Sequence, residues 1–582
     1  MNATSEVTHE AISKAQSWLT VAVDEQTRTA VQHLLDGEPN QLLEAFHSDL
    51  EFGTGGLRGV MGVGTMRMNR YTVGMATQGL ANYIDNQQSD KTKAVAIAYD
   101  SRINSLYFAQ TAAAVLSANG ITVYMFGELR PTPLLSFAVR QLHCIAGIVI
   151  TASHNPKEYN GYKVYWEDGA QVLPPHDRGI IAEVRNVPGI GGVKFDALPS
   201  RIHHISDEVE NEYLRQLSTI IHAKEEIKQA TALKVVYTSI HGAGITMVPR
   251  ALADARFSQV YVVREQATPD GNFSTVSSPN PEEKEALNLA LKLAEEMQAD
   301  LVLGTDPDAD RVGVAVRNSE GLMTLLNGNQ AACLIVHYQL MQWKKKGMLN
   351  GKQYIAKTIV TTNLLEEIAK SFGVKCYDTL TGFKYIAGVI REKEGTETFI
   401  AGGEESYGYS VGEFVRDKDA VLSSVVLAEI AAWCCVNGTT MWQMLMDIYA
   451  QHGLYHETLV SVTMKGLDGA EKIKAMMVAL RATPPVTLGG VPVAQVWDIS
   501  TGEITNKHTG EVSKLQLPAS NVLQFLLDDG SKISARPSGT EPKIKFYFSL
   551  KGPLQSAEHY ATQVQTMNVR IAQIQSDLGL NV

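Results

Sequence analysis

Residues 144–166, CIAGIVITASHNPKEYNGYKVYW, decide how the rest of the chain is interpreted. The apolar and partly β-branched run Cys144–Ile150 predicts a buried strand. Ser, His, Asn and Pro follow it, and these residue types favour a loop over the interior of a sheet. Open α/β sheets bind ligands beyond the carboxyl ends of their strands, so Ser153 is predicted to lie at a functional edge. A polar turn that holds an ordinary serine is the alternative interpretation.

The order strand, helix, strand, helix, strand recurs three times along the chain. The first round covers residues 94–150 and ends just before Ser153, the second covers 234–303, and the third covers 354–401. This alternation predicts an α/β protein with three consecutive domains of similar plan and mainly parallel sheets. After about residue 455 the pattern changes, which predicts a smaller C-terminal α+β domain. We expect a helical extension over about residues 8–48, and domains at 1–200, 201–325, 326–455 and 456–582.

Composition limits the classes of function. The hydrophobic content of 45% and the charged content of 19% are typical of a globular protein with large cores. The net charge of −11 argues against a nucleic-acid partner, because phosphate backbones select basic surfaces. The sequence contains no apolar run of about 18 residues, so no membrane span is expected. The first residues do not resemble a signal peptide. Five cysteines without metal-ligand spacing suit a reduced compartment, so a cytoplasmic location is expected.

Residues 304–311, GTDPDADR, place three carboxylates on alternate positions directly after a predicted strand. Two like charges about 4 Å apart repel by roughly 4 kcal/mol at an effective dielectric near 20, so a cation is expected among Asp306, Asp308 and Asp310. Oxygen ligands without His or Cys favour a hard ion such as Mg²⁺. A solvated acidic turn is the alternative, and an EF-hand is excluded by the missing Gly and Glu.

Three other loops carry chemically useful groups. Residues 402–410, GGEESYGYS, offer acceptors and hydroxyls that suit a polyol, although a capped helix start would look the same. Residues 536–540, RPSGT, with Lys543 close behind, form a plausible phosphate cradle, and a plain basic turn is the alternative. Residues 52–59, FGTGGLRG, could line an anion site with backbone amides or form a flexible glycine turn.

These motifs, in this order, resemble those of the α-D-phosphohexomutases, the family of phosphoglucomutase and phosphomannomutase. The resemblance rests on TASHNP with NGYK, on D-x-D-x-D-R, on GGEES and on RPSGT, and it covers most of the chain. It implies that Ser153 carries a phosphoryl group and that Lys163 assists proton transfer. It also implies that the Ser153 oxygen completes the ligand set of a Mg²⁺ ion held by Asp306, Asp308 and Asp310.

The resemblance assigns further residues by their place in the motifs. Glu404 and Ser406 would bind sugar hydroxyls, and Lys384 and Lys418 would be further substrate contacts. Arg58 and Arg311 would help to neutralise the phosphoserine, and His154 would orient the serine loop or be a satisfied structural histidine. The substrate phosphate that does not react would bind at Arg536, Ser538, Gly539, Thr540 and Lys543.

The implied activity is the interconversion of glucose 1-phosphate and glucose 6-phosphate, with glucose 1,6-bisphosphate as intermediate and primer. The helical extension and the length of 582 residues are similar to the longer phosphoglucomutase and phosphopentomutase branch. Mannose or pentose phosphate is the alternative substrate, and a metal-dependent sugar phosphatase is the alternative enzyme. A sugar-phosphate sensor on an inactive fold is disfavoured because Ser153 and all three aspartates are present. A sugar phosphate is the expected partner of a monomer or dimer, without nucleic acid or membrane.

Overall fold

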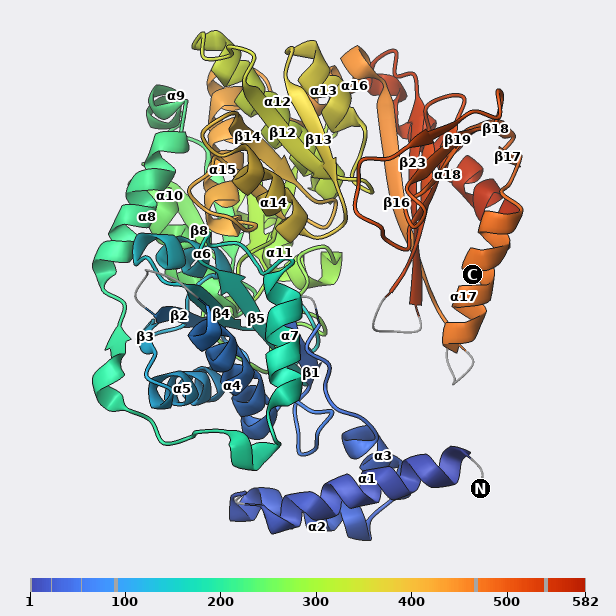
Figure 1. Cartoon of the computed structure of the whole chain (residues 1–582). Helices are drawn as coiled ribbons and strands as arrows, with labels where there is room; N and C mark the ends of the chain where they lie inside the picture. Colours follow the sequence, from blue (N-terminus) through green and yellow to red (C-terminus); the bar gives the residue numbers. More distant parts are fainter. Residues whose placement is uncertain are drawn as a thin grey trace.

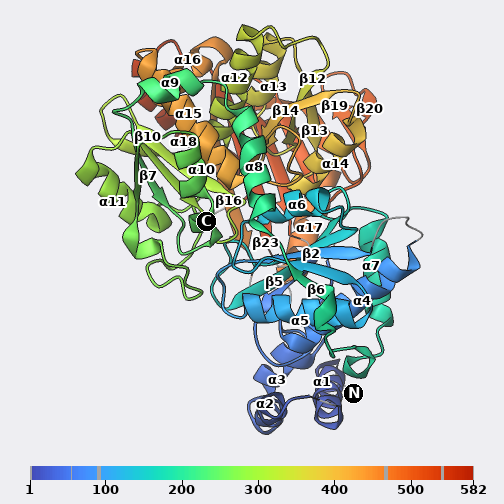
Figure 2. The same cartoon turned by 90° about the vertical axis from the view of Figure 1, so that its left-hand side faces the viewer.

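A computed structural model describes residues 3–21, 23–53, 55–87, 93–464, 469–538 and 543–580 of the chain. Three α/β domains pack together, and a sheet-rich C-terminal domain lies to one side of them (Figure 1 and Figure 2). The predicted fold class is therefore confirmed. The polar loops singled out in the sequence occupy equivalent places in the first three domains, because each follows a central strand of its sheet.

The helical extension consists of α1 (Ala3–Thr20), α2 (Glu25–Asp36) and α3 (Pro39–Phe46), and it projects below the first domain in Figure 1. Asp24 caps α2 by accepting a hydrogen bond from the Thr27 amide, and Pro39 opens α3, where its missing N–H is harmless. The ring of Trp18 packs edge-on against those of Phe46 and Tyr71, each centroid 5.5 Å away. Because Tyr71 belongs to the first domain, this aromatic cluster anchors the extension to the body of the molecule.

The first domain holds a six-stranded sheet in the order β1-β5-β4-β2-β3-β6. The pairs β4–β2, β2–β3 and β3–β6 are parallel, whereas β1–β5 and β5–β4 are antiparallel. The strands are β1 (Gly56–Val60), β2 (Ala94–Tyr99), β3 (Thr122–Met125), β4 (Ala146–Ile150), β5 (Tyr159–Trp166) and β6 (Ile202–His204). The helices are α4 (Arg70–Asn86), α5 (Ser105–Ala118), α6 (Thr132–Gln141) and α7 (His176–Asn186).

The second and third domains repeat this plan on sheets in the orders β11-β10-β9-β7-β8 and β13-β12-β14-β15. The second contains α8 (Asp207–Ile220), α9 (Lys224–Gln229), β7 (Lys234–Thr238), α10 (Val248–Asp254), β8 (Gln259–Val262), α11 (Asn288–Met297), β9 (Leu301–Thr305), β10 (Val312–Arg317) and β11 (Met323–Leu326). The third contains α12 (Gly328–Lys345), β12 (Gln353–Thr358), α13 (Leu364–Ser371), β13 (Lys375–Thr379), α14 (Phe383–Lys393), β14 (Thr398–Gly403), β15 (Tyr409–Val411), α15 (Ala420–Val436) and α16 (Met441–His452).

The C-terminal domain is an antiparallel sheet in the order β16-β23-β22-β21-β18-β19-β20, with β17 paired to β18. Its elements are β16 (Leu454–Thr463), α17 (Gly469–Ala482), β17 (Thr487–Leu488), β18 (Val491–Asp498), β19 (Glu503–Asn506), β20 (Val512–Lys514), β21 (Leu523–Leu527), β22 (Lys532–Pro537), β23 (Lys543–Gly552) and α18 (Tyr560–Asp577). A buried apolar cluster joins it to the third domain through Ile359, Val360, Leu380, Ile499, Val522 and Tyr547.

Each polar loop of the first three domains connects a central strand to an antiparallel neighbour. The register pairs Val149 with Lys163 across β4–β5, Thr305 with Val312 across β9–β10, and Gly403 with Tyr409 across β14–β15. The sequence analysis placed the loops correctly after their strands but did not recognise the three return strands β5, β10 and β15. Consequently the sheets are mixed, and every loop is the tip of a hairpin at the edge where its domain meets the others.

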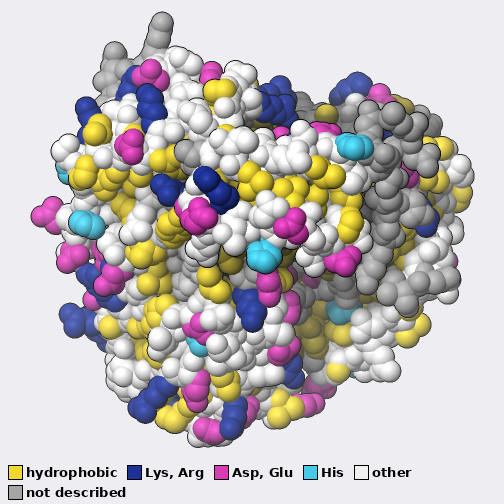
Figure 3. Space-filling model, turned by 90° about the horizontal axis from the view of Figure 1, so that it is seen from below, with side chains coloured by type: hydrophobic (Ala, Val, Ile, Leu, Met, Phe, Trp, Pro, Cys, Tyr) yellow, Lys and Arg dark blue, Asp and Glu magenta, His cyan; other side chains and the backbone are white. Residues whose placement is uncertain are grey.

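Among the described helices, none is by itself long and apolar enough to cross a membrane. The pair α15 and α16 reaches that length only across a bend of 89°. On the surface seen in Figure 3, acidic and basic side chains are interspersed with apolar ones.

Gly161 on β5 provides a test of how closely the hairpin packs. A Cβ at this position would lie 2.5 Å from the Thr151 carbonyl oxygen and 3.0 Å from that of Leu57. Since both neighbours are backbone, Gly161→Ala should destabilise the protein by about 1–3 kcal/mol, as overpacking of a filled site does. Thermal unfolding of the purified variant measures this effect.

The matched control is Gly191→Ala, because a Cβ there would meet nothing within 4 Å. We expect its unfolding temperature to equal that of the parent protein. Equal unfolding temperatures for the Gly161 and Gly191 variants would contradict the close packing of β1, β5 and the serine loop.

Candidate active site

Ser153 lies at the tip of the β4–β5 hairpin in a buried, left-handed conformation with φ of 52°. Its backbone N–H donates to the Thr151 hydroxyl at 2.8 Å, which holds the turn. The Ser153 hydroxyl donates to Asp306 Oδ2 at 2.8 Å and lies 3.1 Å from His154 Nδ1. The nucleophile candidate of the first domain therefore touches the acidic loop of the second.

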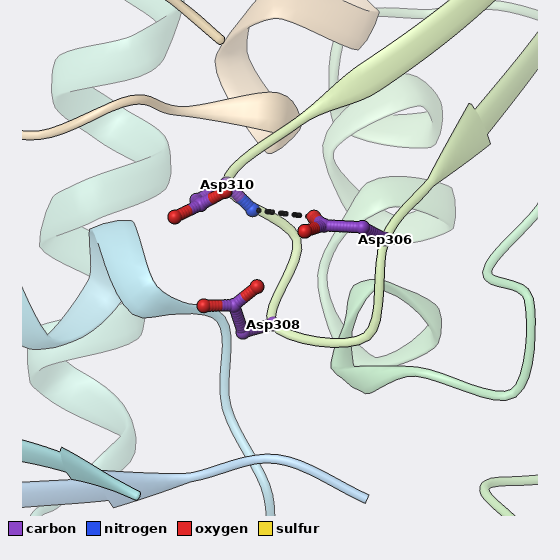
Figure 4. Close-up of side chains that lie close together, drawn as sticks. All are labelled: Asp306, Asp308 and Asp310. Atoms are coloured by element: carbon purple, nitrogen blue, oxygen red, sulfur yellow. Dashed lines mark hydrogen bonds between the residues drawn. The ribbon is translucent and has the colours of Figure 1, made fainter. Parts of the chain in front are cut away.

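Asp306, Asp308 and Asp310 form the acidic cluster shown in Figure 4. One carboxylate oxygen from each lies within 4.8 Å of the others, and all three residues are buried. The loop turns back on itself because Asp306 Oδ1 accepts the backbone N–H of Asp310 at 3.1 Å and that of Arg311 at 3.0 Å. Burial and the two neighbouring carboxylates raise the pKa of Asp306 well above its ordinary value.

Basic side chains from three domains surround the cluster. Lys163 Nζ of β5 donates to Asp308 Oδ2 at 2.8 Å and to Asp310 Oδ2 at 3.3 Å. Lys418 precedes α15, and its Nζ lies 3.0 Å from Asp310 Oδ2. Arg311 Nη1 donates to Glu282 Oε1 at 2.7 Å. Burial alone would raise the pKa of Asp310, but these cations lower it well below its ordinary value.

The donor set fits a divalent cation. Asp308 Oδ1 and Asp310 Oδ1 are buried and accept no hydrogen bond from the described residues. Buried carboxylate oxygens without a donor are costly unless a cation approaches them. Three carboxylates and a hydroxyl, with no His or Cys, are the ligands that Mg²⁺ prefers, and Asp306, Asp308, Asp310 and Ser153 are the residues that would hold it.

Thr132 contacts the acidic loop, and the sequence analysis missed it. At the start of α6, its hydroxyl donates to Asp308 Oδ2 at 2.9 Å and its backbone N–H donates to the Asp308 carbonyl at 2.8 Å. A ribbon of the first domain passes beside Asp308 in Figure 4. The only distinctive feature of the sequence here is the pair of prolines that flank Thr132, and prolines do not indicate a contact with Asp308.

His154 and Arg58 lie beside the serine loop. Arg58 of β1 donates from Nη1 to Asn155 Oδ1 at 3.2 Å. In the antiparallel register of β1 and β5, Arg58 pairs with Gly161, which places it close to the serine loop. Burial, together with Arg311 and Arg58, lowers the pKa of His154 well below its ordinary value. The imidazole is therefore neutral at physiological pH and can share a hydrogen bond with the serine hydroxyl.

The sugar-site candidates lie at the tip of the β14–β15 hairpin. Glu404 is buried, and its Oε1 accepts the backbone N–H of Gly382 at 2.9 Å, which ties it to the start of α14, where Lys384 lies. Ser406 is half-buried beside Tyr407, whose carbonyl accepts the N–H of Val312 just after the acidic loop. The structure therefore brings the hairpin tips of the second and third domains together. Burial lowers the pKa of the Lys384 ammonium.

The phosphate-site candidates lie on the C-terminal domain. Arg536 is the next-to-last residue of β22, and the Ser538 N–H donates to the Lys543 carbonyl at 2.7 Å. Gly539 and Thr540 lie outside the described residues. Burial and Asp177 raise the pKa of Tyr385 in the third domain, and the positive charge of Arg536 opposes that rise.

Comparisons with known proteins agree with this geometry. The families described as phosphoglucomutase/phosphomannomutase alpha/beta/alpha domains I, II and III match residues 49–188, 211–321 and 327–452. A phosphoglucomutase of Staphylococcus aureus strain USA300 is 38% identical over 538 residues, 91% of this chain and 95% of that protein. A phosphoglucomutase of the bovine strain RF122 / ET3-1 is 39% identical over 516 residues, 88% of this chain and 91% of that protein.

Solved structures share the fold. A putative phosphomannomutase from Thermus thermophilus superposes with a TM-score of 0.66 at 22% identity, covering 91% of this chain and 99% of that one. The open form of Paramecium parafusin, a phosphoglucomutase, gives a TM-score of 0.65 at 18% identity, covering 92% of this chain and 96% of that one. At these identities the two structures support the fold alone.

The acidic cluster predicts that Mg²⁺ stabilises the folded protein. A ligand that binds only the native state at about 100 times its Kd adds about 2.7 kcal/mol to the free energy of unfolding. We therefore expect the unfolding temperature to rise when Mg²⁺ replaces a chelator, and we expect Asp308→Asn to remove most of that rise. Differential scanning calorimetry of both proteins measures it.

Asp447→Asn is the control, because Asp447 is an exposed aspartate on α16 whose carboxylate accepts a hydrogen bond from the Gln443 side chain. This variant should keep the full Mg²⁺ response. An unfolding temperature that is independent of Mg²⁺ in the parent protein would refute the assignment of the metal site.

Proposed function

This chain belongs to the phosphoglucomutase/phosphomannomutase family and is an isomerase that interconverts glucose phosphates, and we propose that it does so through a phosphoserine formed at Ser153. The observation that carries this proposal is the contact between the Ser153 hydroxyl and Asp306 Oδ2 at 2.8 Å. This contact supports the proposal because it places the seryl oxygen in the same site as the candidate metal-binding loop, and phosphoryl transfer requires that arrangement.

The reaction is a pair of phosphoryl transfers. The P–O bond to Ser153 breaks as a new P–O bond forms to a hydroxyl of the bound glucose phosphate, giving glucose 1,6-bisphosphate and a free serine. The proton that the sugar hydroxyl loses balances the proton that the seryl oxygen gains. The bisphosphate turns end for end and returns its other phosphate to Ser153, so the net change is isomerisation. Glucose 1,6-bisphosphate also serves as the primer that first phosphorylates Ser153.

The charges around Ser153 support this chemistry. A phosphoserine adds about −1.5 to −2 charge, and Mg²⁺ bound at the aspartates would neutralise part of it as a hard cation. Neighbouring acids raise the pKa of Lys163 against the effect of burial, so its ammonium is protonated. We assign Lys163 to give a proton to the seryl oxygen as the phosphoryl group leaves. Arg58 and Arg311 stabilise the transferring charge, and His154 orients the loop.

The remaining candidates hold the substrate in this proposal. Glu404 and Ser406 accept and donate hydrogen bonds to sugar hydroxyls, with Lys384 and Lys418 alongside. The loop from Arg536 to Lys543 binds the phosphate that does not react and so presents the opposite hydroxyl to Ser153. We further propose a cytoplasmic enzyme without nucleic-acid or membrane partners, which is supported by five free cysteines.

Replacement of the nucleophile tests the proposal directly. Ser153→Ala should reduce turnover of glucose 1-phosphate to background in a coupled assay with Mg²⁺ and glucose 1,6-bisphosphate, because no seryl oxygen remains to carry the phosphoryl group. Intact-mass measurement should find one phosphoryl group on the parent protein and none on the variant.

Ser371→Ala, at the exposed end of α13, is the control and should keep both activity and phosphate. Turnover that survives in the Ser153 variant would refute the phosphoserine role. Steady release of inorganic phosphate by the parent protein, without any need for the bisphosphate, would instead identify a sugar phosphatase.

The distal phosphate site makes a separate kinetic prediction. A phosphate that does not react is bound equally in the ground state and the transition state, so loss of its contacts raises KM more than it lowers kcat. Arg536→Gln should therefore raise KM for glucose 1-phosphate by about tenfold or more, as expected for a charged hydrogen bond. Lys514→Gln, on exposed β20, is the control. A lower kcat with unchanged KM would contradict this role of Arg536.

A further inference from the structure

Arg102, in the turn between β2 and α5, grips the backbone of the serine loop. Its side chain is fully buried. Nη1 donates to the Pro156 carbonyl at 2.9 Å and to the Tyr159 carbonyl at 3.1 Å. Nη2 donates to the Ser153 carbonyl at 2.5 Å and also to the Asn155 carbonyl. Ser153, Asn155 and Pro156 belong to the connection between β4 and β5 that carries the proposed phosphoserine, and Tyr159 is the first residue of β5.

This loop depends on an external donor for its shape. Residues 153–158 lie outside the ladder of β4 and β5, so several of their carbonyls have no strand partner. Ser153 has a left-handed φ of 52°, which a non-glycine residue adopts only where its surroundings impose it. A planar guanidinium can serve four carbonyls at once, whereas a lysine ammonium has three donors and no fixed plane.

Arg102 is itself held from two domains. Asp100 Oδ2 lies 3.4 Å from its Nε, and Asp100 Oδ1 accepts the Arg102 N–H at 2.9 Å. The ring of Phe273, from the second domain, faces the guanidinium with 5.0 Å to its centroid. The second domain also approaches the same turn closely, because a Cβ on Gly271 would lie 2.5 Å from the Ile103 nitrogen.

We infer that Arg102 is a positioning residue for phosphoryl transfer, which fixes the loop of Ser153 in register with the acidic loop of the second domain. It contacts no reacting atom. Its guanidinium joins the backbone of the nucleophile loop to a ring from the domain that supplies the metal ligands. This inference rests on the proposed function, because it concerns the transfer of a phosphoryl group to and from Ser153.

The test is Arg102→Lys, compared with the parent enzyme in the mutase assay and in rapid-quench phosphorylation by glucose 1,6-bisphosphate. A misplacement of a reacting group by about 1 Å lowers a rate about 100-fold, so we expect kcat and the rate of Ser153 phosphorylation to fall by about that factor. The sugar and distal phosphate contacts belong to the third and fourth domains, so KM should change by less than about twofold.

Arg317→Lys is the matched control. Arg317 of β10 also donates to three backbone carbonyls, those of Ala299 at 2.8 Å, Gly321 at 2.7 Å and Ala294 at 3.4 Å. These lie at the opposite end of β10 from the acidic loop. Its replacement should lower the unfolding temperature and leave kcat, KM and the phosphorylation rate as in the parent enzyme.

Phe273→Leu is a second variant in case the Arg102 variant does not fold. It keeps the hydrogen bonds of Arg102 and removes the ring from the second domain, so kcat should fall several-fold at constant KM. An unchanged kcat in this variant would overturn the proposed coupling between the two domains.

Two further results separate the possible failures. Parent-like kcat and phosphorylation rates in Arg102→Lys, or equal losses in Arg102→Lys and Arg317→Lys, would overturn the positioning role while the proposed function stands. A parent enzyme that acquires no phosphate on Ser153 would overturn the proposed function itself.

Discussion

The arrangement of the molecule depends on keeping three buried carboxylates in one place. Asp306, Asp308 and Asp310 repel one another at low dielectric, and the second domain alone does not balance them. Lys163 and Thr132 reach the cluster from the first domain, and Lys418 reaches it from the third. The side chains that balance part of the charge of the acidic loop therefore come together only when the three domains meet, which makes the site a property of their packing.

Much of the fold follows from sequence patterns, because the strand and helix alternation is strong and each round ends in a polar loop. What the patterns concealed is the return strand of each hairpin. VGVAVR after the acidic loop is buried on both faces, so it shows no alternation of polar and apolar residues. YNGYKVYW overlaps the motif that identifies the serine loop, and YSV is only three residues long. Each return strand pairs with the strand just before it, but its own residues do not show the pattern of a strand.

The site was predictable to the extent that its groups carry distinctive chemistry at fixed spacing. The serine and the aspartates are found together, and Lys163 joins them because Val149 pairs with Lys163 in the hairpin register. Arg102 and Thr132 were missed for a common physical reason. Both act on backbone carbonyls or on one carboxylate of another loop, so their partners are set by tertiary packing and leave no spacing in the sequence.

The charge balance of the site would link the proposed phosphorylation of Ser153 to metal binding. Burial and two neighbouring acids raise the pKa of Asp306, so additional negative charge is unfavourable at this position. A phosphoryl group on Ser153 would add about −1.5 to −2 charge next to that same carboxylate. Lys163 and Lys418 are already paired with Asp308 and Asp310, so they cannot balance the added charge alone. A divalent cation bound at the aspartates would supply the missing charge, so a phosphoryl group on Ser153 and the metal would stabilise each other.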